Sequence, residues 1–202
     1  AATTPGARYV VLTDRHTSPF LERHAEVAIT APDDAPLMLK YTIAQMEYEK
    51  RADAGLVVLA ATDCIANRNL DDATPTACGL ALTHKKAGAI NNIAYVRDHG
   101  LAAWFLGRAI DVLQRYPAGI QAWCGDQRSW EFALGEWGGD GEIKTAEPFG
   151  RRIFVYPCAS HNSFPLRSGS LKAGGAFLYH FKGGRKEHLV SSAEQIIARG
   201  TH

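Results

Sequence analysis

The sequence predicts an α/β fold, a three-layer α/β/α sandwich around a mostly parallel central sheet. The runs LVVLAA (residues 56–61) and GLALT (79–83) are continuously apolar, without the alternation that a strand with one solvated face would show. Predicted strands and helices alternate along the chain, with no internal repeat or low-complexity linker. A length of 202 residues with 46% hydrophobic residues suits one domain, spanning 1–202.

The first half of the chain predicts strand, strand, helix, strand and strand in order. Two short apolar runs, YVVLT at 9–13 and EVAIT at 26–30, are each followed by turn-forming residues. Apolar residues then recur at intervals near three and four over residues 35–51, which predicts an amphipathic helix. The two apolar runs described above follow, and the run at 56–61 is the expected central strand.

The second half predicts helices and strands by the same patterns. A long helix with a buried face is expected over residues 100–113, ending near Pro117, and another over 125–137. The remaining elements are strands at 152–156 and 176–181, and a terminal helix at 192–199 with Ser191 or Ser192 as its cap.

Composition narrows the classes of partner and compartment. Twenty-two Lys and Arg against 21 Asp and Glu give a formal charge of +1, which argues against nucleic acid or an anionic membrane as partner. No apolar stretch approaches the roughly 20 residues of a membrane span. Four scattered cysteines without a C-x-x-C pair predict reduced thiols, no zinc site and a cytoplasmic location.

Two predicted strands end in groups that suit a metal. Asp63 follows the expected central strand, either as a carboxylate available to a cation or as a simple turn residue. His180 ends the last strand and precedes KGGRK (182–186), a basic, glycine-rich turn suited to phosphate or a solvated loop. Carboxylate oxygen and imidazole nitrogen together suit Mn²⁺ or Mg²⁺.

The run HFKGGRK (180–186) contains H-x-x-G-x-x-K and resembles the carboxyl-terminal signature of glycogenin-like retaining glycosyltransferases of the GT-A fold, which use nucleotide-sugars. LVVLAATDCIANRNL (56–70) resembles that family's strand and D-x-D metal motif, and TACGLALTHK (76–85) its next strand. GDQRSWEFAL (125–134) resembles the Asp-Gln helix that faces the donor sugar, and HNSFP (161–165) the loop before the last strand.

The resemblance implies a role for each matching residue. Asp63, as the second aspartate of D-x-D, and His180 would bind Mn²⁺ or Mg²⁺. Gly183 and Lys186 would meet the donor diphosphate, and Lys40 or a neighbour would supply a further basic group. The implied activity is transfer of a hexose from a UDP-sugar, with retention, to a saccharide, protein or small-molecule acceptor.

Asp126 and Gln127 are implied to face the donor sugar, although Asp126 also suits the cap of the helix that follows. The chain departs from the family at Ala61, which replaces the first aspartate of D-x-D, and at Ala77, which replaces an asparagine. The family's first strand also has no clear counterpart. These departures leave a second hypothesis open, a noncatalytic GT-A-like domain that binds a nucleotide, a sugar or a protein.

Overall fold

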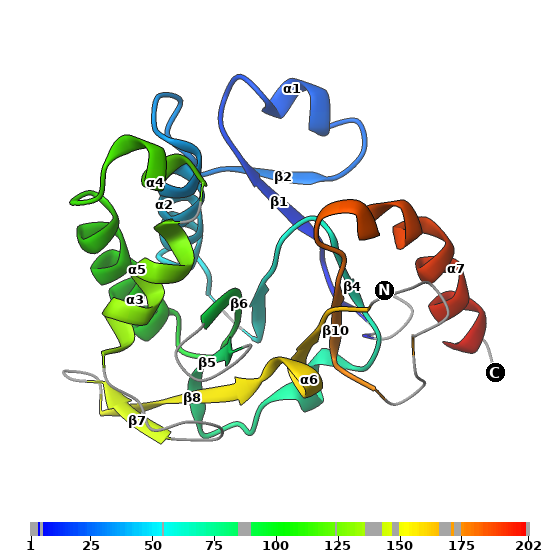
Figure 1. Ribbon diagram of the computed structural model, residues 1–202. Helices are drawn as coiled ribbons and strands as arrows, with labels where there is room; N and C mark the ends of the chain where they lie inside the picture. Colours follow the sequence, from blue (N-terminus) through cyan, green and yellow to red (C-terminus); the bar gives the residue numbers. More distant parts are fainter. Residues whose placement is uncertain are drawn as a thin grey trace.

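The structure is a computed structural model that confirms the α/β class (Figure 1). It describes residues 4, 6–53, 55–84, 90–123, 125–135, 143–146, 150–165, 171 and 175–200. The main sheet has the strand order β3-β6-β5-β8-β7. Its strands are β3 (Val57–Leu59), β5 (Cys78–His84), β6 (Ile90–Val96), β7 (Ile143–Ala146) and β8 (Arg151–Pro157).

The sheet is mixed rather than mostly parallel, which corrects the sequence prediction. β5 and β8 pair in parallel, whereas β3–β6, β5–β6 and β7–β8 are antiparallel. β3 lies at one end of this sheet and not at its centre, because β6 is inserted between β3 and β5. The sequence INNIAYV of β6 carries two asparagines, Asn91 and Asn92, which interrupt the apolar pattern and hid the strand.

Helices cover one face of the sheet. They are α2 (Leu37–Glu49), α3 (His99–Leu113), α4 (Ala118–Trp123) and α5 (Gly125–Leu134). The Asp98 carboxylate accepts a hydrogen bond from the Leu101 amide at 3.0 Å and so caps α3. Apolar residues of α3 and α5 pack on the inward face of β5, β6 and β8, and the rings of Phe105 and Trp130 meet edge to face at 5.6 Å.

A small second sheet packs on the opposite face, where the sequence predicted a helical layer. It consists of β4 (Cys64–Ala66), β10 (Leu178–His180) and β9 (Asn162–Ser163). Phe177 and Leu178 bury their side chains against Ile93 and Tyr95 of β6. The remaining elements here are η1 (Leu70–Ala73), α6 (Cys158–His161), η3 (Gly183–His188) and α7 (Leu189–Gly200).

α7 lies beyond this small sheet, where Ile196 packs against Tyr179 and Phe181. The amino-terminal strands β1 (Val10–Thr13) and β2 (Glu26–Ile29) form a separate two-stranded parallel sheet, joined through the single-turn helix α1 (Ser18–Leu21). This sheet lies near the end of α2, apart from the main sheet (Figure 1).

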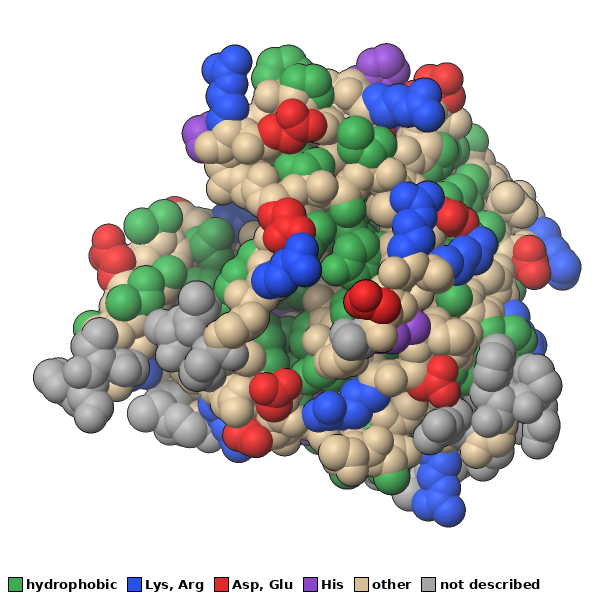
Figure 2. Space-filling model, turned by 180° about the vertical axis from the view of Figure 1, so that it is seen from behind, with side chains coloured by type: hydrophobic (Ala, Val, Ile, Leu, Met, Phe, Trp, Pro, Cys, Tyr) green, Lys and Arg blue, Asp and Glu red, His purple; other side chains and the backbone are tan. Residues whose placement is uncertain are grey.

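Charges of both signs are interspersed over the face drawn in Figure 2, and neither sign gathers into a broad field. This distribution agrees with the formal charge of +1. Within the described ranges, every helix is too short or too polar to cross a bilayer.

Candidate active site

Asp63 and His180 are 117 positions apart in the chain and meet through the pairing of β4 with β10. The strands are antiparallel, with His180 directly opposite Cys64, and the Phe181 amide donates to the Asp63 carbonyl at 2.9 Å. This ladder brings His180 Nε2 to 3.1 Å from Asp63 Oδ1. The two residues that the sequence proposed as metal ligands are therefore adjacent.

Cys64 is a third potential ligand that the sequence reasoning missed. Directly paired residues of an antiparallel ladder present their side chains on the same face, so the Cys64 thiol lies on the His180 side. One potential ligand atom from each of Asp63, Cys64 and His180 lies within 4.8 Å of the other two. The signal in the sequence was the position of Cys64 immediately after the candidate ligand Asp63.

The His180 imidazole is in the chemical form that a metal requires. Burial lowers its pKa to about 4 although the Asp63 carboxylate acts in the opposite direction, so the ring is neutral at pH 7. Its Nδ1 is enclosed and has no hydrogen-bond partner among the described residues. The centre of the Phe164 ring lies 5.3 Å from the centre of the His180 ring. A neutral imidazole beside a carboxylate fits a divalent cation.

Two lysines of the segment after β10 lie near this pair, and one of them reaches the Asp63 carboxylate. Lys186 Nζ lies 3.2 Å from Asp63 Oδ2, although 60% of the Lys186 side chain remains exposed. The Lys182 ammonium lies 5.5 Å from the centre of the Phe164 ring. The glycine-rich segment itself is the 3₁₀ helix η3, which begins at Gly183. The sequence-proposed phosphate residues Gly183 and Lys186 are thus next to the candidate metal ligands.

Asp126 occupies the first turn of α5 and is buried. Gly125 permits this placement, since a Cβ there would lie 2.7 Å from the Ile120 carbonyl oxygen. The Gln127 amide donates to Asp126 Oδ1 at 2.8 Å, and Asn92 Nδ2 donates to Oδ2. Burial raises the pKa of Asp126, and the nearby Lys182 charge opposes that rise. Asn92 was not identified from the sequence.

Tyr41 of α2 responds to both carboxylates. Burial raises the pKa of its hydroxyl to about 12, and the negative charges of Asp63 and Asp126 contribute to that rise. The Tyr41 hydroxyl is therefore close enough to both carboxylates to respond to their charges. Lys182 likewise acts on both Asp126 and His180. The sequence-proposed metal residues and sugar-facing residues are therefore coupled electrostatically through Tyr41 and Lys182.

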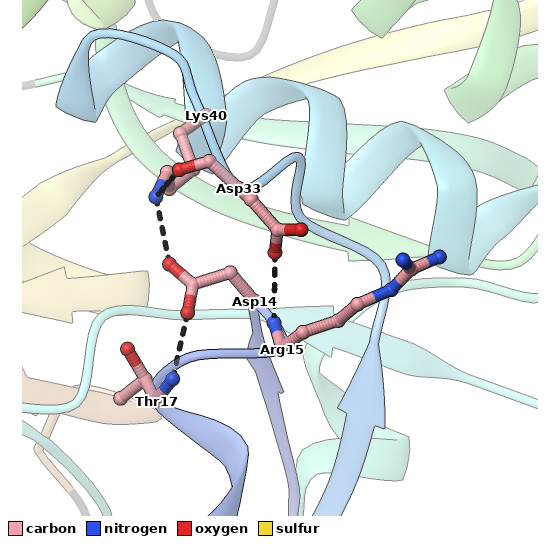
Figure 3. Close-up of polar contacts among 5 residues, drawn as sticks. All are labelled: Asp14, Arg15, Thr17, Asp33 and Lys40. Atoms are coloured by element: carbon pink, nitrogen blue, oxygen red, sulfur yellow. Dashed lines mark hydrogen bonds and ion pairs between the residues drawn. The ribbon is translucent and has the colours of Figure 1, made fainter.

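Lys40 points elsewhere, although it precedes Tyr41 on α2 (Figure 3). Its Nζ donates to Asp14 Oδ2 at 2.7 Å and to the Asp33 carbonyl at 2.8 Å. Asp14 also accepts from the Thr17 amide, and these bonds hold the pKa of its carboxyl well below the usual value. Lys40 ties α2 to the end of β1, and its proposed contact with a donor stays a prediction.

Comparison with known proteins supports the fold. A glycosyltransferase involved in the glycosylation of the major capsid of PBCV-1 has a similar structure, with a TM-score of 0.50 and 14% sequence identity. The match covers 89% of this chain and 88% of that one, so the two folds have a similar extent. No family model matches the sequence, and no curated protein is significantly similar to it. The likeness therefore concerns the α/β fold and not a particular activity.

Proposed function

We propose that this chain is a metal-dependent glycosyltransferase that transfers a hexose from a UDP-sugar to an acceptor, with retention of anomeric configuration. The main support is the convergence of Asp63 and His180 beside the lysine turn of η3. The similarity of the fold to that of a glycosyltransferase further supports this proposal. The acceptor is a saccharide, a protein or a small molecule.

Asp63 and His180 would hold Mn²⁺ or Mg²⁺. When bound, such an ion supplies Lewis-acid stabilisation of the negative charge on a leaving diphosphate. Lys186 now neutralises Asp63, but an ion pair with a mostly exposed lysine contributes only about 0–1 kcal/mol. Lys186 can therefore leave the carboxylate at little cost and bind diphosphate oxygens, together with the backbone of η3 at Gly183.

Asp126 and Gln127 would orient the donor sugar. Asn92 and the Gln127 amide hold the Asp126 carboxylate in one orientation, so its remaining acceptor capacity would be available to sugar hydroxyls without reorganisation. Tyr41, whose hydroxyl keeps its proton at neutral pH, would be a further hydrogen-bond donor for the sugar. These residues bind and position the substrate, which is where much of the rate enhancement of a transferase originates.

The competing proposal is a noncatalytic GT-A-like domain that binds a nucleotide, a sugar or a protein. Ala61 favours it, because the D-x-D motif then retains one carboxylate. Loss of one preorganised electrostatic partner costs about 2.7–4 kcal/mol at a transition state, which slows an enzyme without abolishing it.

Incubation with Mn²⁺ and a panel of UDP-sugars tests the transferase proposal. We expect slow hydrolysis of at least one donor without acceptor, and faster transfer with a suitable saccharide. The anomeric configuration of the product, read by NMR, tests retention. Absence of any turnover from folded protein contradicts the enzyme proposal.

Calorimetry separates the two proposals. UDP binding that Mn²⁺ strengthens, and that His180→Ala abolishes, supports a working donor site. Binding that is indifferent to both metal and His180→Ala supports the noncatalytic domain. The exposed His24→Ala serves as a control for nonspecific effects of losing an imidazole.

A further inference from the structure

The metal site differs from a simple Asp–His pair in the position of Cys64. Donor atoms that share a tetrahedral ion at about 2.0–2.3 Å from it lie about 3.3–3.8 Å from one another. Asp63 Oδ1 and His180 Nε2, at 3.1 Å, already approach this spacing. Cys64 offers its sulfur within the same 4.8 Å group, and its place opposite His180 follows from strand register rather than from one rotamer.

Ligand charge gives Cys64 a chemical reason to take part. In the D-x-D motif that this segment resembles, two carboxylates stand near the ion, but here Ala61 has replaced the first. A Cys64 thiolate would supply a second anionic ligand. The thiolate and the Asp63 carboxylate would then balance the charge of a divalent ion, with the neutral His180 imidazole as the third ligand. Sulfur binds metal as thiolate, so the thiol proton passes to solvent on binding.

The other described cysteines are not placed for this role. Cys78 is almost fully buried in β5, and the Cys158 sulfur accepts a hydrogen bond from Asn91 Nδ2 at 2.9 Å. Cys64 is only partly buried, and it carries no disulfide. Thiolate is the ligand that favours soft or borderline ions such as Zn²⁺ over Mg²⁺ and Mn²⁺, which prefer oxygen.

We propose that Cys64 is a third protein ligand of the Asp63–His180 site, and that its sulfur shifts the preference of the site from Mn²⁺ and Mg²⁺ toward Zn²⁺ and Co²⁺. This inference rests on the metal site of the proposed function, and it reverses the prediction from cysteine spacing that the chain has no zinc site. It concerns the identity of the bound ion and leaves the donor and acceptor open.

Cobalt spectroscopy of the untagged protein gives a direct readout that does not depend on turnover. Titration of the wild type with Co²⁺ should produce visible d–d bands together with a near-ultraviolet sulfur-to-cobalt charge-transfer band. Cys64→Ser should lose the charge-transfer band and keep weaker d–d bands. Cys78→Ser, the matched control, should keep both.

The outcomes separate this inference from the proposal beneath it. Visible bands without charge transfer in the wild type overturn the role of Cys64 and leave the Asp63–His180 site intact. Absence of both bands, with no calorimetric binding of Co²⁺, Zn²⁺ or Mn²⁺ in the presence of UDP, overturns the metal site itself and therefore both proposals.

Affinity ratios test the change in preference. We expect Cys64→Ser to weaken Zn²⁺ binding at least about tenfold, and Mn²⁺ binding by much less. An equal loss for the two ions overturns the claim of selectivity. Should Cys64→Ser fail to fold by circular dichroism, X-ray absorption of the zinc-loaded wild type decides instead, because a sulfur at about 2.3 Å supports the ligand and its absence overturns it.

Discussion

Two carboxylate–imidazole pairs in this molecule have similar geometry and different surroundings. Glu49 Oε2 lies 2.7 Å from His99 Nδ1, where the end of α2 meets the start of α3. Asp63 Oδ1 lies 3.1 Å from His180 Nε2, at the end of β10. The Glu49 side chain is completely buried, whereas 13% of the Asp63 side chain is exposed.

The difference lies in the groups that surround each pair. Among the described residues, His99 is the one partner that lowers the pKa of Glu49 against the effect of burial, and Glu49 Oε1 and His99 Nε2 are enclosed without hydrogen-bond partners. Asp63 instead has the Cys64 thiol and the Lys186 ammonium close to it, in addition to His180 Nε2. The Glu49–His99 pair therefore joins two helices, whereas the Asp63–His180 pair has additional groups beside it that suit the proposed site.

The largest expected effect is on turnover. Asp63→Asn keeps the size of the side chain and removes its charge, so transfer should fall by about 100- to 1000-fold. The measurement is the initial rate with the active UDP-sugar at saturating Mn²⁺. The exposed Asp72→Asn should leave the rate unchanged, and a fully active Asp63→Asn would contradict the assignment.

The structural pair should control stability instead. His99→Ala leaves the Glu49 carboxyl buried without a partner, and the free energy of unfolding should fall by about 3 kcal/mol. Urea denaturation measures this, with the exposed His24→Ala as the matched control. The folded fraction should still bind UDP, and loss of binding without loss of stability would reverse the distinction between the two pairs.

The buried pair also predicts a pH dependence of stability. Burial raises the pKa of Glu49 above its usual 4.5, so the native state holds this proton more tightly than the unfolded state does. The contribution of Glu49 to stability is complete below that value and is lost as pH rises through the raised native pKa.

Glu49→Gln removes this titration. The stability of the variant should therefore improve relative to wild type as the pH rises from about 4 toward neutrality. Urea denaturation of both proteins at several pH values measures the difference, and a difference that stays constant with pH would count against the raised pKa.

The smallest stability effect is expected at Lys186. Lys186→Met removes an ion pair whose ammonium is mostly exposed, so the free energy of unfolding should change by less than about 1 kcal/mol. UDP affinity should nevertheless fall. Lys50→Met removes an exposed ion pair with Glu47 of α2 and is the matched control. It should change the free energy of unfolding by a similar amount and leave UDP affinity unchanged. Equal UDP affinity in the two variants would separate Lys186 from the donor site.

Patterns of apolar residues in the sequence predicted the strands and helices that have a continuous buried face. Continuous apolar runs identified β5 and the end of β10, and regular spacing identified α2 and α3. Asp63 and His180 were identified because each follows such a run, where loops carry functional groups.

The parts that were missed depend on contacts between distant segments. β6 was not predicted because Asn91 and Asn92 interrupt its apolar pattern. Since β6 lies between β3 and β5, β3 is at the end of the sheet and not at its centre. Cys64 follows Asp63 in the sequence, but its place opposite His180 depends on the pairing of β4 with β10, and Asn92 reaches Asp126 only through the packing of β6 against α5. The spacing of residues within one segment does not reveal how distant segments pair or pack.

The register of β10 against β4 makes the site an all-or-none feature of folding. A slip of one residue would set Tyr179 opposite Cys64 and turn the His180 imidazole to the other face of the ladder. The proposed metal ligands thus come together only when β10 has paired with β4 in this register. Hydrogen exchange at Phe181, whose amide bonds to the Asp63 carbonyl, should report the integrity of the whole centre.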